Sequence, residues 1–284
     1  MAVYRQTYRG YTGTLTPAWS RFTILYRYAR RNLFQSKLLF GYFVACFIIP
    51  LVDLIVIYAM NNPTFLARLN IGLVIHINRG FFNSYLHYQC FMAFLFTAFA
   101  APGLISPDLA NGGLPLYLSR PFSRAEYLAG KFAVLFILLS ELTWIPGLVL
   151  FAVECGVGGT AWRADNLWLG PAIVAASLVW IVVLSLLALA LSAWIKWRVV
   201  AGAALLGIYF FGAGLGGAVN AVLQTQNGSL LDFMELHLIV WRGLLRLPPP
   251  PLALQNEAWI VLVAIAAGSL ALILKKIRPL EVVK

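Results

Sequence analysis

The sequence predicts an all-α integral membrane protein with six transmembrane helices. Its 284 residues are 61% hydrophobic and 11% charged, with a mean hydropathy of +0.83. Soluble domains contain about 45–50% apolar and about 25% charged residues. The second observation is a set of six apolar stretches, each near the roughly 20 residues that cross a bilayer. The third is an uneven distribution of basic residues between the stretches. Together they predict one transmembrane domain covering residues 1–284.

The six predicted spans are separated by connections of very different length, the longest being residues 224–257. They cover approximately Leu38–Ala59, Gln89–Ile105, Tyr127–Val153, Trp168–Trp194, Val199–Leu223 and Ala258–Leu274. The second and sixth apolar runs are short, and an extension of the second back towards Phe81 stays open.

Lysine and arginine fall mainly on one side of the predicted spans. If both termini are cytoplasmic, sixteen of the 21 lie in cytoplasmic segments and five in outer segments. Short cytoplasmic loops carry the excess of basic residues, so both termini are expected on the cytoplasmic side of the cell (inner) membrane. The net charge of +11 is then explained by topology and by contact with membrane lipid, and nucleic acid is not expected as a partner.

The cytoplasmic N-terminus, residues 1–37, contains a predicted amphipathic helix. Thr16 and Pro17 have the chemistry of a helix start. The apolar residues that follow at near-helical spacing are Phe22, Leu25, Ala29 and Leu33. Arg27, Arg30 and Arg31 occupy the other faces, which is typical of a helix lying in the membrane interface. Two readings stay open: anchoring of the first span, or a contribution to a docking surface for a cytoplasmic partner.

The loop between the second and third spans, residues 106–126, carries the most specific pattern. Ser106-Pro107-Asp108 predicts the start of a short cytoplasmic helix, and Pro121 predicts its end. Ser123 and Glu126 then form a capping box that begins the third span. The pattern indicates a helix, a rigid elbow and a second helix. An ordinary tight connection between helices is the alternative.

The run Leu116–Lys131 resembles the corresponding loop of type-two ABC export permeases, which combines leucines, Ser-Arg-Pro, a Ser-Arg pair, Glu-Tyr-Leu and Gly-Lys. The six spans, the interfacial helix and the basic C-terminus agree with that family. The resemblance implies a permease domain whose loop is a coupling helix docked on a separate P-loop ATPase subunit. It also implies a second permease copy or related permease, and ATP-driven export. The implied ATPase-docking residues are Asp108, Leu116, Tyr117, Ser119, Arg120, Arg124 and Glu126.

The front of the loop departs from the family pattern. An acidic residue followed by Gly-Thr-Leu-Glu is usual there, whereas Asp108 is followed by Asn111–Pro115 in this chain. A proline inside a helix costs about 3 kcal/mol. The coupling helix therefore either begins at Pro115 or is broken there.

Motifs for nucleotide or metal chemistry are missing from the sequence. Gly130-Lys131 is preceded by Ala125 instead of the first P-loop glycine and followed by Phe132 instead of Ser or Thr. No H-E-x-x-H, G-x-S-x-G or C-x-x-C pattern occurs. We therefore expect no enzyme activity, metal or cofactor in this chain, and ATP and Mg²⁺ on the partner subunit.

The histidines and cysteines give no metal-binding spacing. His76, His87 and His237 are expected outside the spans. Cys90 and Cys155 both lie near the predicted outer boundary, so a disulfide between them stays open.

Two carboxylates lie inside predicted spans, at similar depth. Asp53 and Glu141 are candidates for the translocation path, or for a proton-sharing pair if they face each other. Separate hydrogen bonds to neighbouring helices are the other reading. The alternative functions are an ion-coupled secondary transporter that uses these two residues, or a non-transporting membrane anchor of a larger assembly.

Glycines and prolines mark further features. Gly212 and Gly216 form a G-x-x-x-G motif in the fifth span, which the family places near the dimer axis and the translocation path; close packing within one subunit is the alternative. Pro50 and Pro146 predict kinks in the first and third spans. The outer loop, residues 224–257, is expected to contain a short helix ended by prolines 248–251, which would be an outer gate in the family.

Overall fold

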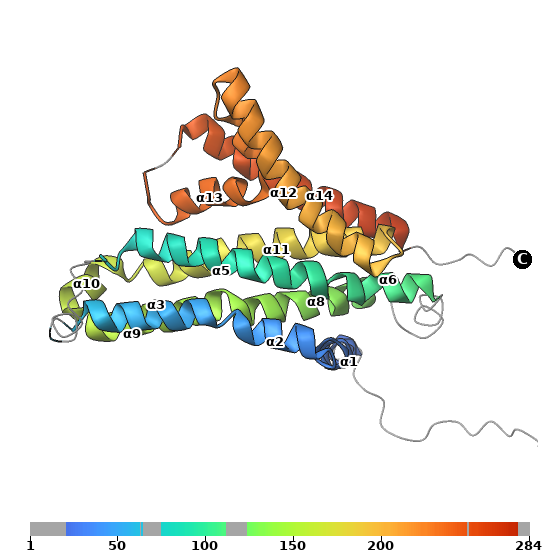
Figure 1. Ribbon diagram of the computed structural model, residues 1–284, viewed down its shortest axis with the longest axis horizontal. Coiled ribbons are helices and arrows are strands. Elements are labelled where there is room, and N and C mark those ends of the chain that lie inside the picture. Colours follow the sequence, from blue (N-terminus) through green and yellow to red (C-terminus); the bar gives the residue numbers. More distant parts are fainter. Residues whose placement is uncertain (1–20, 63, 65–74, 112–123, 249, 278–284) are drawn as a thin grey trace, which may run out of the picture.

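The computed structural model describes residues 21–62, 64, 75–111, 124–248 and 250–277. This part of the chain folds into helices, with the order shown in Figure 1. The helices are α1 (Arg21–Phe34), α2 (Lys37–Ala45), α3 (Ile48–Met60), α5 (Arg79–Ala100), α6 (Pro102–Ala110), α8 (Arg124–Leu142), α9 (Trp144–Val157), α10 (Gly159–Asn166), α11 (Leu169–Trp194), α12 (Arg198–Leu223), the 3₁₀ helix η2 (Asn227–Leu230), α13 (Phe233–Leu244) and α14 (Leu252–Lys276).

The six predicted spans are confirmed as helices long and apolar enough to cross a membrane. The first, second and third each consist of two helices in line, α2–α3, α5–α6 and α8–α9, and the others are α11, α12 and α14. We call the end of the bundle where α2 and α12 begin and α14 ends the basic end (Figure 1).

The extension of the second span towards Phe81, which the sequence left open, is confirmed. The span begins at Arg79, so the expectation that His87 lies outside the spans is wrong. Asn83 and His87 lower the hydropathy of this segment, although Phe82 and Leu86 in the same turns are fully buried. The Asn78 side chain caps the helix, accepting hydrogen bonds from the Gly80 and Phe81 amides at 2.8 and 3.3 Å.

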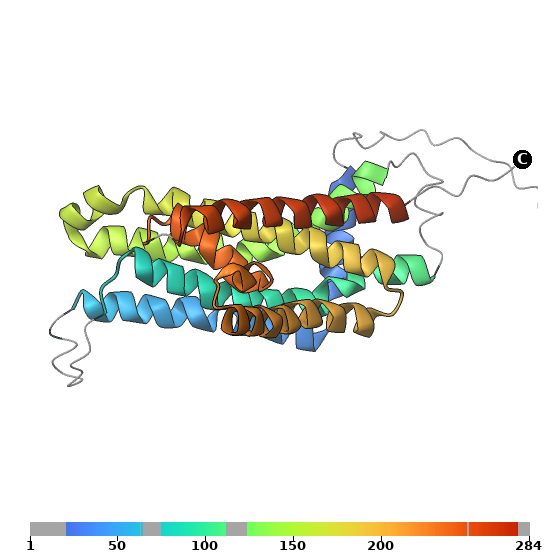
Figure 2. The same ribbon diagram turned by 90° about the horizontal axis from the view of Figure 1, so that it is seen from above.

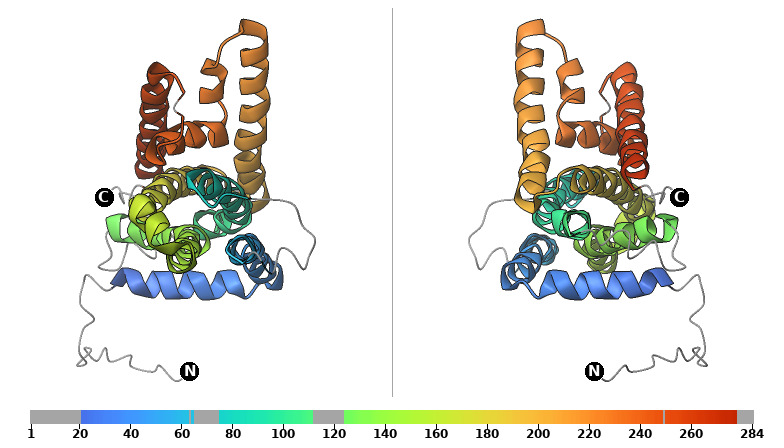
Figure 3. Two further views of the ribbon diagram at one scale, coloured as in Figure 1. Left: turned by 90° about the vertical axis from the view of Figure 1, so that its left-hand side faces the viewer. Right: turned by 90° about the vertical axis from the view of Figure 1, so that its right-hand side faces the viewer.

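The packed core of the molecule surrounds α11. This helix lies against α5, α6, α8, α9 and α14, and its buried face includes Trp180 and Leu184. Figure 3, which views the bundle end-on, places α12, α13 and α14 together on one side and α1 on the opposite side. The C-terminal half of α12 leans away from the bundle (Figure 1).

Helix α1 runs crosswise to the spans near the basic end (Figure 2). Ala29 and Leu33 are buried, and α1 packs against α8. Arg27 and Arg31 are exposed, as expected for an interfacial helix. The predicted helix start at Thr16 and Pro17 lies outside the described residues.

The first and third spans are interrupted where the prolines predict kinks. Helix α2 ends at Ala45 and α3 begins at Ile48, two residues before Pro50. In the third span, α8 ends at Leu142 and α9 begins at Trp144, two residues before Pro146. A proline lacks the N–H that would bond to the carbonyl four residues earlier, which frees one carbonyl in each span.

The predicted short helix of the outer loop is confirmed as α13. Asp232 caps it, accepting hydrogen bonds from the Met234 and Glu235 amides. The helix ends at Leu244, before the prolines, and Arg246 has a φ of 51°. Most of its residues are buried, and the indole of Trp241 donates to the Ala176 carbonyl at 3.0 Å. Since Ala176 lies seven residues inside α11, α13 enters the bundle by about 10 Å.

Candidate functional site

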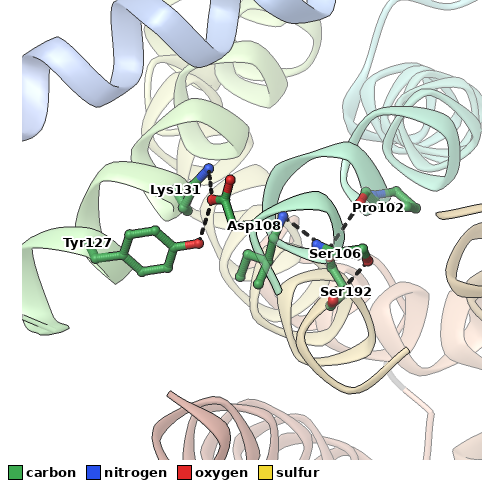
Figure 4. Close-up of polar contacts among 7 residues, drawn as sticks. Pro102, Ser106, Asp108, Tyr127, Lys131 and Ser192 are labelled. Atoms are coloured by element: carbon green, nitrogen blue, oxygen red, sulfur yellow. Dashed lines mark hydrogen bonds and ion pairs between the residues drawn. The ribbon is translucent and has the colours of Figure 1, made fainter. Parts of the chain in front are cut away.

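A polar clamp joins the two helices that flank the loop at the basic end. The ammonium of Lys131 lies 2.8 Å from Oδ2 of Asp108, and the Tyr127 hydroxyl donates to the same oxygen at 2.8 Å (Figure 4). Asp108 belongs to the last turns of α6, whereas Tyr127 and Lys131 belong to the first turns of α8. Only 9% of the Lys131 side chain is exposed, which strengthens the electrostatic attraction. The clamp therefore holds the two ends of the intervening loop together.

The start of α6 is fixed by a serine of another helix. The Ser192 hydroxyl of α11 accepts hydrogen bonds from the Ile105 and Ser106 amides and donates to the Pro102 carbonyl (Figure 4). The Ser106 hydroxyl donates to the Ser192 carbonyl at 2.8 Å. These bonds give partners to the Pro102 carbonyl and to the Ile105 and Ser106 amides, in the first two turns of α6. The prediction that a helix begins at Ser106-Pro107-Asp108 is wrong, because these residues lie inside α6, which begins at Pro102.

The predicted ATPase-docking residues are only partly within the described structure. Helix α8 begins at Arg124, directly after the Ser123 that predicts it, and Glu126 lies in its first turn. Asp108 has its two partners inside the chain. The others, Leu116, Tyr117, Ser119 and Arg120, lie outside the described residues, and so does Pro115.

A buried glutamine connects the two proline-broken spans. The side-chain amide of Gln89 donates to the Cys46 carbonyl at 3.2 Å and to the Leu142 carbonyl at 2.5 Å. These are the carbonyls four residues before Pro50 and Pro146, which the prolines leave without a backbone donor. One fully buried side chain of α5 thus satisfies both breaks with its two amide hydrogens.

Tyr85, one turn away from Gln89, strengthens this junction. Its hydroxyl donates to the Thr143 carbonyl at 2.6 Å, at the break between α8 and α9. Tyr85 and Thr143 are both buried. Three spans therefore meet at one polar junction, which we call the Gln89 junction and define by Gln89, Tyr85, Cys46, Leu142 and Thr143.

The structure does not bring Asp53 and Glu141 together. Glu141 pairs with Arg30 of α1, with Nη1 and Oε1 3.4 Å apart, and lines a cavity between α3 and α9. Asp53 lines another cavity, between α3 and α5, and its Oδ2 is buried with no partner among the described residues. The proton-sharing pair is thus wrong, and the helix α1 supplies the partner that sequence spacing could not indicate.

The glycines of the G-x-x-x-G motif pack within the subunit. A Cβ built on Gly212 would lie 2.6 Å from the Leu231 carbonyl oxygen, and one on Gly216 would lie 2.5 Å from that of Gly228. The two glycines therefore let the backbone of the segment before α13 approach α12. Close packing within one subunit is therefore confirmed at Gly212 and Gly216, and their place beside a translocation path stays a prediction.

Of the histidines, His237 lies in α13, outside the membrane-spanning helices. Its ring is fully buried, and Nδ1 lies 2.7 Å from the Phe233 carbonyl. Burial lowers the pKa of His237 to about 4, while the bond to Phe233 acts in the opposite direction. Cys90 and Cys155, whose pairing the sequence left open, are free thiols.

Sequence reasoning missed the residues that make these connections. In the sequence, Gln89 is only the first residue of an apolar stretch. Lys131 is one of many basic residues assigned to the cytoplasmic side, and Arg30 is one of three arginines on the polar face of the N-terminal helix. The prolines at positions 50 and 146 were a usable signal, because each requires a donor for a freed carbonyl. Nothing in the spacing indicates which side chain supplies it.

Comparison with known proteins decides the family. Residues 63–237 match the model of the family described as ABC-2 family transporter protein. The chain belongs to this family. It is an integral membrane protein and the membrane permease subunit of an ABC transporter. A search of curated protein sequences finds no match. In the permease, the matched region runs from the segment before the second span to the middle of α13, and includes the clamp, Gln89 and its partner Leu142 in α8.

Proposed function

We propose that the permease is driven by a separate P-loop ATPase subunit that docks on the cytoplasmic loop between α6 and α8. The proposal is supported by the family, whose members work in ABC transporters, and by the sequence, which contains no P-loop motif. The excess of basic residues at the basic end supports a cytoplasmic location for this loop and for both termini, in the cell (inner) membrane.

The clamp is the observation that carries the proposal. Because Asp108, Tyr127 and Lys131 join α6 to α8, a push on the loop moves both helices together instead of bending the loop. Helix α8 ends at the Gln89 junction, where its last carbonyl is bonded to α5. Movement of α8 is therefore passed to the first span, whose Cys46 carbonyl binds the same glutamine.

The transport direction and the assembly are part of the same proposal. We infer export, with two permeases, either two copies or two related chains, pairing around the translocation path. The surface of α12 supports pairing, since its large apolar residues Phe210, Phe211 and Val222 are exposed. ATP and Mg²⁺ bind the ATPase subunits. The permease supplies the translocation path, with the breaks near Pro50 and Pro146 as the points where its spans can bend.

The test is purification of the tagged permease from its native membrane in mild detergent, with co-purifying chains identified by mass spectrometry. We expect a stoichiometric P-loop ATPase. Reversing two charges of the loop, Arg120→Glu with Arg124→Glu, is expected to lower its recovery about tenfold or more, because like charges in an interface cost several kcal/mol. The matched control is Arg163→Glu, in α10 at the opposite end.

A second variant separates docking from coupling. Lys131→Met removes the ion pair of the clamp and leaves the Tyr127–Asp108 hydrogen bond and the predicted docking residues Arg120 and Arg124 in place, so the ATPase should still co-purify. The ATP-dependent change in distance between spin labels at the exposed residues Ala129 and Lys196 should shrink. A permease purified without any ATPase, or an unchanged recovery in the charge-reversed variant, would contradict the proposed docking surface.

A further inference from the structure

Two cavities adjoin at the basic end of the permease. The first, of about 150 Å³, lies under α1 and is walled by α2, α6, α8 and the start of α12. The second, of about 350 Å³, is an open groove between α2 and α12, with α5 at its floor. Both have Ser36, Leu39 and Arg198 in their walls, so one continues into the other.

The first cavity is polar and carries net positive charge. Its charged wall residues are Asp108, Lys131 and Arg198, of which Asp108 and Lys131 neutralise each other. The guanidinium of Arg198 lies against the backbone of Gly103, where a Cβ would be 3.5 Å from its Cζ, and donates to the Phe99 carbonyl. Asn32 of α1 adds an amide to the same wall. A positive charge with neighbouring donors suits an anionic group.

The second cavity is apolar. Beyond the three shared residues, its walls are Leu38, Ala98, Phe99, Val199, Gly202, Ala203 and Leu206. Leu38 and Val199, at its mouth, are 70% and 82% exposed. In a membrane protein these side chains face hydrocarbon, and the groove runs from Ser36, just after α1, along the first turns of α12.

We propose that this pair of cavities binds one anionic phospholipid of the inner leaflet. The phosphate occupies the polar cavity beside Arg198 under α1, and an acyl chain lies in the groove between α2 and α12. The combination of a cationic cavity and an apolar groove, joined at Arg198, distinguishes a lipid from a free anion, which would leave the groove without an occupant. The site is independent of the ATPase proposed above.

The occupant would hold α1 and α12 together. Tyr28, Ala29, Asn32 and Leu33 of α1 form one wall of the polar cavity, and the first turns of α12 form the wall of both. A bound lipid therefore bridges the interfacial helix and a span that packs loosely on the bundle. Its loss should loosen both elements.

The experiment is native mass spectrometry of the full-length permease released from nanodiscs that contain equal amounts of phosphatidylglycerol and phosphatidylcholine. We expect retention of one phosphatidylglycerol in preference to phosphatidylcholine. Arg198→Gln should lower phosphatidylglycerol retention about tenfold, the effect of losing a charge-assisted hydrogen bond. Arg198→Lys should restore part of it. Lys196→Gln, which removes an exposed charge two residues away and outside both cavities, is the matched control and should retain the lipid.

A second variant tests the groove. Ala203→Trp fills it without changing charge and should lower the retention of both lipids. Equal retention in Arg198→Gln and Lys196→Gln would overturn the proposal. So would displacement of the lipid by millimolar inorganic phosphate in the wild-type permease, which would indicate a site for the anion alone. Disulfide formation between two copies of Ala203→Cys in the membrane would also overturn it, because the groove would then be filled by a second permease.

Discussion

The spans of the permease fall into two groups that are held in different ways. In the most apolar 18-residue stretch of the second span, Arg79–Asp108, 67% of the residues are buried. In the corresponding stretch of the fifth span, Arg198–Leu223, 17% are buried. The third and fourth spans resemble the second, and the first and sixth resemble the fifth. The second, third and fourth spans therefore form a packed core, and the first, fifth and sixth are peripheral.

The difference shows where the polar connections are needed. The core spans are joined by buried bonds such as Ser106–Ser192 and Tyr85–Thr143, which the low dielectric strengthens. Of the peripheral spans, the first is connected through Gln89 and the fifth through close backbone approach to the segment before α13. A bilayer provides no hydrophobic force between helices, so exposed apolar faces are stable in lipid and remain available for a partner.

The two groups of spans should respond differently when the same kind of side chain is removed from each. Phe82 of the second span is fully buried, and Phe211 of the fifth is 72% exposed. Phe82→Ala should lower the free energy of unfolding by about 3 kcal/mol through lost packing, and Phe211→Ala by less than about 0.5 kcal/mol. Chemical unfolding in mixed micelles measures both. An equal loss at Phe211 would mean that this face of α12 is packed in the purified protein.

The Gln89 junction gives the next largest effect. Gln89→Leu leaves the Cys46 and Leu142 carbonyls buried without a donor, and should lower the free energy of unfolding by about 2 kcal/mol. The same micelle titration measures it. Gln226→Leu is the matched control, because Gln226 is exposed and makes no side-chain cap bond. A loss in the control as large as that at Gln89 would assign the effect to glutamine replacement in general.

The smallest effect tests the burial of α13. The pKa of His237 is about 4 in the folded permease and about 6.5 in the unfolded chain, so the unfolded state binds the proton first as the pH falls. Stability is therefore full above pH 6.5 and should fall by about 1 kcal/mol between pH 7.5 and 5.5. His237→Gln should remove this pH dependence, whereas the exposed His76→Gln should retain it. The same slope in both variants would contradict the burial of His237.

Much of the fold was predictable because each span carries its own signal. The number of spans, the interruptions near Pro50 and Pro146, the start of α8 after Ser123 and the short helix in the outer loop are all confirmed. These features depend on local composition and on residues a few positions apart. The start of the second span stayed open between Gln89 and the region of Phe81, because Asn83 and His87 weaken its apolar signal, and the structure places it at Arg79.

The candidate site was less predictable because its residues meet across the bundle. Sequence alone determined that the chain crosses the membrane six times and that its loop resembles a coupling loop, since hydropathy and capping are local properties. Only the tertiary structure decided that Arg30 pairs with Glu141, that Lys131 pairs with Asp108 and that Gln89 serves two broken spans. The physical reason is that a buried polar group needs a partner, and packing selects which distant side chain supplies it.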